Sequence, residues 1–371
     1  MAEKVVICGG GVIGAATAYY LAKRGVAATI IENDGVAAGA SGAAAGLISP
    51  PLPQTAGEPI YELQRRGYEM HLELAETLQA ESGVDYGFAM TPRLSLAVTE
   101  DEEAAARLTI DALSAAGVDS RWLDRDELRG LTGWIDGGEA RGAALLEHGA
   151  HLDAYRYTLA LVTAAERLGV TVRSGTVSGI ETAEGPVIGV RVGREVVPAD
   201  TVVIAMGPWS REASDWLGIR VPVEPLKGQI VKVRPERPLR TFNFGHDGNY
   251  AVAKGSDTVF LGTTEERVGF DRSVTTQARD EILAFGVGFA PELAGAEFIE
   301  QTACLRPLSE DGLPIMGPAP GIEGAYVATG HGRQGILQSL PSGLAMAEMI
   351  LDGRTETIDM RPFDPGRFES G

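Results

Sequence analysis

VVICGGGVIGAATAYYLAKRGVAATIIE, residues Val5–Glu32, is the stretch that decides the fold of this 371-residue chain. Its hydrophobic start predicts a strand at Lys4–Cys8, which a glycine turn at Gly9–Gly14 connects to the next element. A helix over Val12–Arg24 and a second strand at Ala27–Glu32 follow from the hydrophobic pattern. Strand, helix and strand in this order form a βαβ unit with two parallel strands.

Three glycines in this stretch have the spacing of a dinucleotide-binding motif. Gly9, Gly11 and Gly14 form G-x-G-x-x-G between strand and helix. The first permits the turn, the second lets a pyrophosphate approach, and the third packs the helix on the strand. Glu32 ends the second strand, eighteen residues after Gly14, where a carboxylate can accept hydrogen bonds from a ribose. An acidic residue here disfavours a 2′-phosphate, and a plain glycine turn would not explain Glu32.

The rest of the chain indicates two interleaved domains. Helix and strand patterns return at 151–205 and again at 325–351, whereas residues 221–307 alternate as antiparallel strands do. We therefore predict an α/β fold, in which a discontinuous Rossmann-like dinucleotide domain is interleaved with a mainly antiparallel-sheet substrate domain. The predicted boundaries are 1–85, 150–220 and 320–371 for the first domain, and 86–149 and 221–319 for the second.

Composition excludes several classes of function. Acidic residues outnumber basic ones by 51 to 32, and no basic stripe is present, which argues against nucleic acid as a partner. An anionic protein repels anions at long range, so a bound carboxylate needs locally placed cations. Cys8 and Cys304 are the only cysteines, which indicates a reducing cytoplasm, and they show no metal-ligand spacing. The uncharged stretch Val5–Ala22 is interrupted by glycines and lacks the flanks of a membrane segment or signal peptide.

Five segments, in order and spread over nearly the whole chain, carry a family resemblance. They are Val5–Glu32, SGAAAG at Ser41–Gly46, Thr201–Ser210, LRPLSEDGLP at Leu305–Pro314 and GHGRQGIL at Gly330–Leu337. With these segments the chain resembles the D-amino-acid oxidase and glycine oxidase (ThiO-like) family of flavoenzymes. The resemblance implies that the dinucleotide is FAD and that the Rossmann-like domain is an FAD-binding domain.

The resemblance also implies which residues of this sequence contact the cofactor. The turn at Gly330–Gly335 comes before a long helix, whose N-terminus would stabilise negative charge on the flavin pyrimidine ring. The other interpretation is a glycine loop that only connects strand and helix. The resemblance implies FAD contacts at Gly9, Gly11, Val12, Ile13, Gly14, Glu32, Asn33, Ser41, Gly42, Ala45, Gly46, Leu47, Val177, Gly207, Trp209, Gly330, His331, Gly332, Arg333, Gln334, Gly335 and Ile336.

Four residues are candidates for binding the substrate. Arg306 stands where the family has the arginine that grips the substrate carboxylate, and a guanidinium fork suits that group. Tyr250 matches the family's strand tyrosine, and Arg333 matches an arginine near the flavin in glycine oxidases. Glu265 matches a pocket position that is apolar in glycine oxidase. Its carboxylate could hold a substrate ammonium, but pairing with Arg267 at a strand end is the simpler interpretation.

Cys304 raises the question of covalent flavin. It lies two residues before Arg306, near the position where sarcosine oxidases of the wider family carry a cysteine bonded to flavin. Free cysteines are commonly buried as small hydrophobic residues, so non-covalent FAD is expected and attachment through Cys304 is the alternative.

The resemblance implies a function. This is FAD-dependent oxidation of a small amino acid, of glycine, sarcosine or D-amino acid type, to an imino acid that hydrolyses to a keto acid. We expect no catalytic side chain, because the flavin accepts the hydride while the protein orients the substrate. The alternatives are a secondary-amine oxidase or dehydrogenase for sarcosine or proline derivatives, and a flavin-carrying electron-transfer subunit of a larger complex. The electron acceptor is O2 or another compound, and a homo-oligomer is compatible with the sequence.

Overall fold

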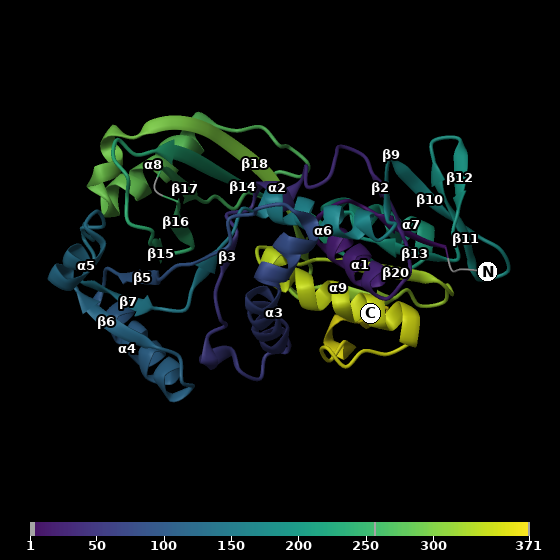
Figure 1. Ribbon diagram of the computed structural model, residues 1–371, viewed down its shortest axis with the longest axis horizontal. Helices are drawn as coiled ribbons and strands as arrows, with labels where there is room; N and C mark the ends of the chain where they lie inside the picture. Colours follow the sequence, from purple (N-terminus) through teal and green to yellow (C-terminus); the bar gives the residue numbers. More distant parts are fainter. Residues whose placement is uncertain (1–3, 256, 370–371) are drawn as a thin grey trace.

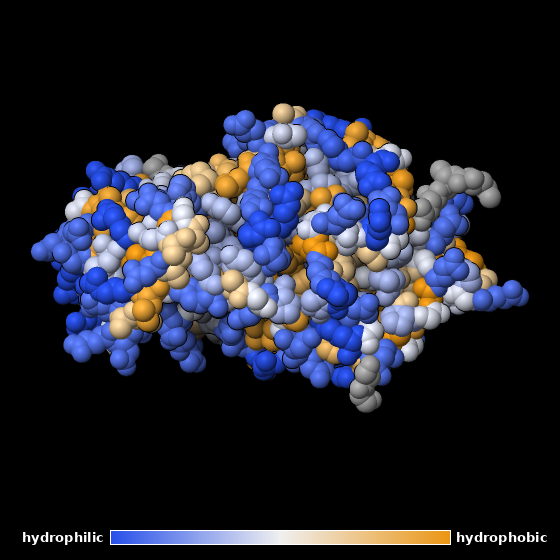
Figure 2. Space-filling view, turned by 90° about the horizontal axis from the view of Figure 1, so that it is seen from below, coloured by the Kyte–Doolittle hydropathy of each residue, from blue (hydrophilic) through white to orange (hydrophobic). Residues whose placement is uncertain are grey.

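The structure is a computed structural model that describes residues 4–255 and 257–369. Two large sheets lie toward opposite ends of an elongated molecule (Figure 1). Within the described residues, no helix is both long and apolar enough to cross a membrane. On the face shown in Figure 2, hydrophobic residues are interspersed with hydrophilic ones.

The six-stranded sheet contains the predicted βαβ unit. The central strand β1 is buried along its whole length, as expected for a strand covered on both faces. It pairs in parallel with β2 and β13, and only β19 at one edge pairs antiparallel with its neighbour among the described strands. The strands in order across the sheet are β19 (Ile315–Pro318), β20 (Ala325–Thr329), β13 (Thr201–Ile204), β1 (Val5–Cys8), β2 (Thr29–Glu32) and β9 (Thr171–Ser174).

Helices from both ends of the chain pack together beside this sheet (Figure 1). The first and last helices meet closely, because Gly343 stands where a Cβ would lie 2.6 Å from the Cβ of Ala16. The C-terminal segment therefore completes the N-terminal fold. These helices are α1 (Val12–Lys23), α3 (Pro59–Ser82), α6 (Ala154–Arg167) and α9 (Gly335–Asp352). Helix α7 (Ala213–Leu217) packs with β1 and β13 in a separate core.

The eight-stranded sheet is antiparallel except for the parallel pair formed by β5 and β15. Side chains such as Leu94, Phe244 and Leu261 point from one face into a core that helix α8 covers. Its strands in order are β18 (Glu297–Ser309), β14 (Val223–Arg234), β17 (Thr258–Gly262), β16 (Asn249–Lys254), β15 (Asn243–His246), β5 (Arg93–Ala97), β7 (Gly142–Leu146) and β6 (Ser120–Asp124). The helices on this side are α4 (Glu100–Ala115), α5 (Arg125–Thr132) and α8 (Thr276–Phe289).

In the described part of the chain, two three-stranded sheets accompany the two large ones. A three-stranded sheet of β3 (Leu47–Ile48), β8 (Ala150–His151) and β4 (Ala89–Met90) follows the short helix α2 (Ala40–Ala43). A second small sheet consists of β10 (Val177–Thr182), β11 (Val187–Val192) and β12 (Glu195–Pro198).

The predicted α/β fold with a mainly antiparallel second sheet is confirmed. The second strand of the βαβ unit begins at Thr29, two residues later than predicted, because the backbone at Gly25 and Val26 still bonds to the end of α1. The domain boundaries stay a prediction.

Candidate active site

A cavity of about 1110 Å³ is lined by residues of both large sheets. Pockets for small molecules usually measure roughly 300–1,000 Å³, so this one has room for a dinucleotide together with a small substrate. Predicted site residues on its wall are Gly9, Gly11, Val12, Ile13, Glu32, Asn33, Ser41, Ala45, Gly46, Leu47, Val177, Gly207, Trp209, Tyr250, Arg306, His331, Gly332, Arg333, Gln334, Gly335 and Ile336.

The three glycines of the motif have different surroundings. A Cβ on Gly9 would lie 2.4 Å from the carbonyl oxygen of Ala205, and one on Gly14 would lie 2.2 Å from that of Gly9. These two glycines are therefore required by packing within the protein. A Cβ on Gly11 would meet only the Ser41 hydroxyl, at 3.2 Å, so Gly11 has open space beside it on the cavity wall.

The start of α1 lies at this end of the cavity. The Ser41 hydroxyl accepts a hydrogen bond from the Val12 amide at 2.9 Å, beside the N-terminus of the helix. Glu32 accepts hydrogen bonds from the amides of Gly10, at 2.6 Å, and Asp34, at 2.9 Å. A helix N-terminus favours a pyrophosphate, and a fixed carboxylate suits a ribose, so these residues fit the predicted dinucleotide.

His331 supplies independent support for a bound group. Its ring is buried, and its Nε2 lies 3.0 Å from the hydroxyl of Ser342. Its Nδ1 has no hydrogen-bond partner among residues 4–255 and 257–369. Burial lowers the pKa of His331 to about 3, so the ring is neutral near pH 7. A buried polar atom without a partner, on a cavity wall, suits a ligand that forms a hydrogen bond with it.

The N-terminus of α9 lies on the same wall. Residues Gly335, Ile336 and Leu337 line the cavity, so the amide end of an 18-residue helix faces it. The positive end of the helix dipole favours an electron-rich ring. The turn before α9 thus presents a positive helix end to the cavity, which fits the predicted flavin.

One face of the eight-stranded sheet forms the other end of the cavity. Alternate residues of a strand point to opposite faces, and here one set enters the apolar core while the other set lines the cavity. The cavity set includes Arg306 and Cys304 of β18, Ile230 of β14, Tyr250 of β16, Asn243 and Gly245 of β15, Arg93 and Ser95 of β5, and Ala144 and Leu146 of β7.

Arg306 is held in place on this wall although only 8% of the residue is exposed. It donates hydrogen bonds to the Thr263 hydroxyl, at 2.6 Å, and to the Thr264 carbonyl, at 3.1 Å. Its guanidinium lies across Gly228 of the neighbouring strand, where a Cβ would stand 2.0 Å from one of its nitrogens. The glycine therefore makes room for the arginine.

Tyr250 lies over a glycine in the same manner. A Cβ on Gly262 would stand 2.6 Å from the Tyr250 hydroxyl oxygen. Burial raises the pKa of Tyr250 to about 12, so the phenol keeps its proton and remains a hydrogen-bond donor. The ring belongs to the cavity wall that also carries Arg306.

Glu265 faces the arginines of the site. Its carboxylate lies 3.0 Å from Arg333 and 4.0 Å from Arg306. The predicted pair with Arg267 is wrong, because Arg267 pairs with Glu224 of β14 instead. In an extended segment, residues two apart lie about 6.6 Å from each other, and here each side chain pairs with a residue of another segment instead.

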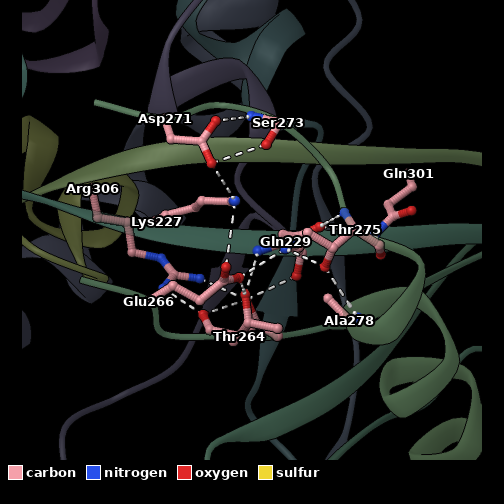
Figure 3. Close-up of polar contacts among 11 residues, drawn as sticks. Lys227, Gln229, Thr264, Glu266, Asp271, Ser273, Thr275, Ala278, Gln301 and Arg306 are labelled. Carbon is pink, nitrogen blue, oxygen red and sulfur yellow. Dashed lines mark hydrogen bonds and ion pairs between the residues drawn. The ribbon is translucent and has the colours of Figure 1, made fainter. Parts of the chain in front are cut away.

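A buried lysine and two carboxylates that are more exposed support the loop that holds Arg306 (Figure 3). Lys227, only 1% exposed, lies 3.4 Å from the carboxylate of Glu266 and 3.3 Å from that of Asp271. Glu266 accepts a hydrogen bond from Thr264, the residue whose carbonyl binds Arg306. Burial alone would raise the pKa of Glu266, but its hydrogen bonds and the Lys227 charge lower it.

Lys227 and Arg93 were not predicted as site residues from the sequence. Both are charged residues within segments that have the pattern of a strand, and this unusual placement is the feature that could have identified them. In the segment from Arg93 to Ala97, leucines alternate with polar residues, which predicts a two-faced strand but not a cavity on the polar face.

Four predicted site residues lie off the cavity wall. Gly14 packs α1 against the motif, and a Cβ on Gly42 would lie 2.3 Å from the carbonyl oxygen of Ala37. Gly330 adopts a φ of +81° at the end of β20, which glycine permits. Glu265 reaches the site only through its contacts with Arg333 and Arg306.

Known proteins resemble this chain along almost its full length. The model of the DAO family, described as FAD dependent oxidoreductase, matches residues 4–349. The glycine oxidase of Geobacillus kaustophilus is 31% identical over 362 residues, which are 97% of this chain and 95% of that protein.

Solved structures agree with this match. The crystal structure of glycine oxidase from Geobacillus kaustophilus superposes with a TM-score of 0.92 at 29% identity and covers 98% of each chain. Iminodiacetate oxidase from Chelativorans sp. superposes with a TM-score of 0.87 at 28% identity, covering 98% of this chain and 99% of that one. Since the family model matches residues 4–349 and a full-length relative is 31% identical, the chain belongs to the DAO family of FAD-dependent oxidoreductases.

Proposed function

We propose that this enzyme oxidises the carbon–nitrogen bond of a small amino acid, of glycine or sarcosine type, to an imino acid that hydrolyses to a keto acid. The relatives that support the proposal are glycine oxidases, which match the chain from end to end. FAD, when bound, supplies the hydride acceptor.

The proposal rests mainly on Arg306, a buried arginine on the cavity wall. Two of its N–H groups bind Thr263 and Thr264, and a guanidinium has five, so it can also bind a carboxylate. Because the protein has a net charge of −19, a carboxylate substrate needs such a local cation. Tyr250, on the same wall, would donate a further hydrogen bond to that carboxylate.

The other residues of the cavity would hold FAD and orient the substrate. Gly11, Ser41 and Glu32 would hold the pyrophosphate and ribose of FAD, and the α9 N-terminus would face its ring system. Glu265 would lie near the substrate amine while it neutralises Arg333. With Arg306 fixing the carboxylate and the sheet excluding water, the α-carbon is oriented without a catalytic base.

A secondary amine is the second candidate substrate. Iminodiacetate oxidase, one of the structural neighbours, has a name that describes oxidation of a secondary amine. The same cavity and the same arginine would serve a sarcosine-like compound, because only the substituent on nitrogen differs.

Product analysis tests the proposal. The purified holoenzyme is incubated in air with glycine, sarcosine, D-alanine, L-alanine and methylamine, and keto acid and peroxide are measured. We expect glyoxylate and peroxide from glycine or sarcosine. Turnover of methylamine alone, or of no compound in the panel, would contradict the proposal. Flavin reduction without peroxide would instead indicate an acceptor other than O2, as in a dehydrogenase or an electron-transfer subunit.

Gly228→Ala should raise the KM for the carboxylate substrate about tenfold, equivalent to the loss of roughly one hydrogen bond. The added Cβ would stand 2.0 Å from an Arg306 nitrogen, so the guanidinium must move. The matched control is Gly130→Ala, since a Cβ there meets nothing within 4 Å. Steady-state kinetics with an unchanged KM in Gly228→Ala would mean that the position of Arg306 does not matter for binding.

The flavin should be released into the supernatant when the holoenzyme is precipitated with acid. Cys304 lies on the cavity wall but is only 6% exposed, and burial raises the pKa of its thiol. Attachment needs a thiolate, which this environment disfavours. A pellet that stays yellow in the wild type, and becomes colourless in Cys304→Ala, would show a covalent bond instead.

Two further expectations are part of the proposal. The buried, unpaired cysteines Cys8 and Cys304 fit a reducing compartment such as the cytoplasm. The domain boundaries at residues 85, 149, 220 and 319 keep the strands of each large sheet within one domain except β19, the edge strand of the six-stranded sheet, which falls within 221–319.

A further inference from the structure

Three arginines lie near the end of the cavity that the eight-stranded sheet forms, which we call the substrate end. They differ in the carboxylates that neutralise them. Arg306, Arg333 and Arg93 all line the wall. Glu265 pairs with Arg333 at 3.0 Å and approaches Arg306 to 4.0 Å. Arg93 forms no ion pair within 4.0 Å among the residues that the structure describes.

Arg93 also has few other partners. One hydrogen bond joins it to the Ser49 hydroxyl, at 3.4 Å, which is at the long limit for such a bond. This bond uses one of the five N–H donors of the guanidinium. A residue that only donates a hydrogen bond to the Ser49 hydroxyl would not need to be charged.

The position of Arg93 directs it into the cavity. In the register of the sheet it lies beside Asn243 on one side and Leu146 on the other, and both of these residues line the cavity. Its neighbour Leu94 points to the opposite face, into the apolar core. The side chain therefore belongs to the face that carries Tyr250 and Arg306.

The electrostatics of this position favour an anion. Burial lowers the pKa of Arg93, and the nearby charge of Arg333 lowers it further. Arg333 is already occupied, because it donates to Glu265 and, at 2.8 Å, to the carbonyl of Gly248. A half-buried guanidinium beside a second cation is stabilised when an anion binds to it.

We propose that Arg93 forms a distal anion subsite, so that the preferred substrate is an amino acid with a second acidic group. Its α-carboxylate lies at Arg306 and its second anion lies at Arg93. This inference rests on the proposed amino-acid oxidation and adds the substrate class to it. Glycine and sarcosine would then be minimal substrates that leave the distal subsite empty.

Inert thioether acids test the subsite without turnover. Methylthioacetate has one carboxylate, whereas thiodiacetate and its homologues with one or two additional methylene groups carry a second carboxylate at increasing distance. Dissociation constants are measured from the change in the visible flavin spectrum of the holoenzyme. We expect at least one diacid to bind about tenfold or more tightly than methylthioacetate, as a charge-assisted pair provides.

The variants assign the effect to Arg93. Arg93→Gln should remove most of the diacid advantage, and Arg93→Lys should keep part of it, because an ammonium retains the charge but not the fork. Arg121→Gln is the matched control: this exposed residue lies on β6 of the same sheet, paired with Glu127, and does not line the cavity. It should keep the full advantage.

The same comparison is made by turnover, as the ratio of kcat/KM for iminodiacetate to that for sarcosine. Equal binding of all diacids and the monoacid to wild type, or an unchanged diacid advantage in Arg93→Gln, would overturn the subsite while leaving amino-acid oxidation in place. If no amino acid reduces the flavin, the proposed function fails first, and the inference fails with it.

Discussion

Arg306→Leu should weaken binding of the carboxylate substrate tenfold to more than a hundredfold. The change removes a charge-assisted pair worth roughly 1.5–3 kcal/mol or more. The loss should be seen in kcat/KM and in the dissociation constant from anaerobic titration. Arg306→Lys should recover only part of it, because an ammonium cannot form the bidentate pair. Tyr250→Phe should cost less, on the order of 0.5–1.5 kcal/mol for one hydrogen bond.

Controls separate substrate binding from stability. FAD content and the melting temperature should stay close to wild type in these variants, because Arg306 and Tyr250 lie on the substrate end of the cavity. Arg267→Leu is the matched control, since this exposed arginine pairs with Glu224 and does not line the cavity. If Arg306→Leu oxidises the same amino acid with unchanged kinetics, the carboxylate is bound elsewhere and a simple amine becomes the better substrate.

Gly11→Val should yield a colourless protein, with FAD binding weakened by about a hundredfold or more, because its side chain occupies the space that a pyrophosphate needs. The backbone at Gly11 is extended, with a φ of −73°, so valine fits it without strain. A Cβ meets only the Ser41 hydroxyl, at 3.2 Å, so the chain should still fold. Flavin content after purification and reconstitution with FAD measure the effect.

Two comparisons make this result specific. Gly9→Val and Gly14→Val should instead lower stability, since a Cβ at either position overlaps a backbone carbonyl oxygen. Gly130→Val, in open space on α5, should keep its FAD. A Gly11→Val protein that is folded and fully yellow would show that the cofactor does not approach this glycine.

Local patterns allowed much of the fold to be predicted from the sequence. The hydrophobic run Val5–Cys8, the glycines that follow and Glu32 specify a βαβ unit, because each feature acts within a few residues. The turn at Gly330–Gly335 likewise predicts the start of α9. The interleaving of the chain was also predictable, because the pattern changes from helix–strand alternation to antiparallel strands near residue 221.

The charged contacts of the site could not be predicted in the same way. Glu265 pairs with Arg333, sixty-eight residues away, and Lys227 pairs with Asp271 across a loop. Such partners depend on strand order and register, which one sequence does not specify. Arg93 reaches the cavity only because β5 lies beside β15, a parallel pairing between segments about 150 residues apart.

Anaerobic titration of the purified holoenzyme tests the central claim most directly, since it requires no assumption about the electron acceptor. Glycine, sarcosine and iminodiacetate are compared with methylamine, which lacks a carboxylate, and the visible absorbance of the flavin is followed in wild type and in Arg306→Leu. We expect at least one of the amino acids to bleach the wild-type flavin, whereas methylamine should not. Arg306→Leu should need tenfold to a hundredfold more amino acid for the same bleaching. A flavin that stays oxidised with every amino acid, or that methylamine bleaches equally well in both proteins, would contradict the central claim.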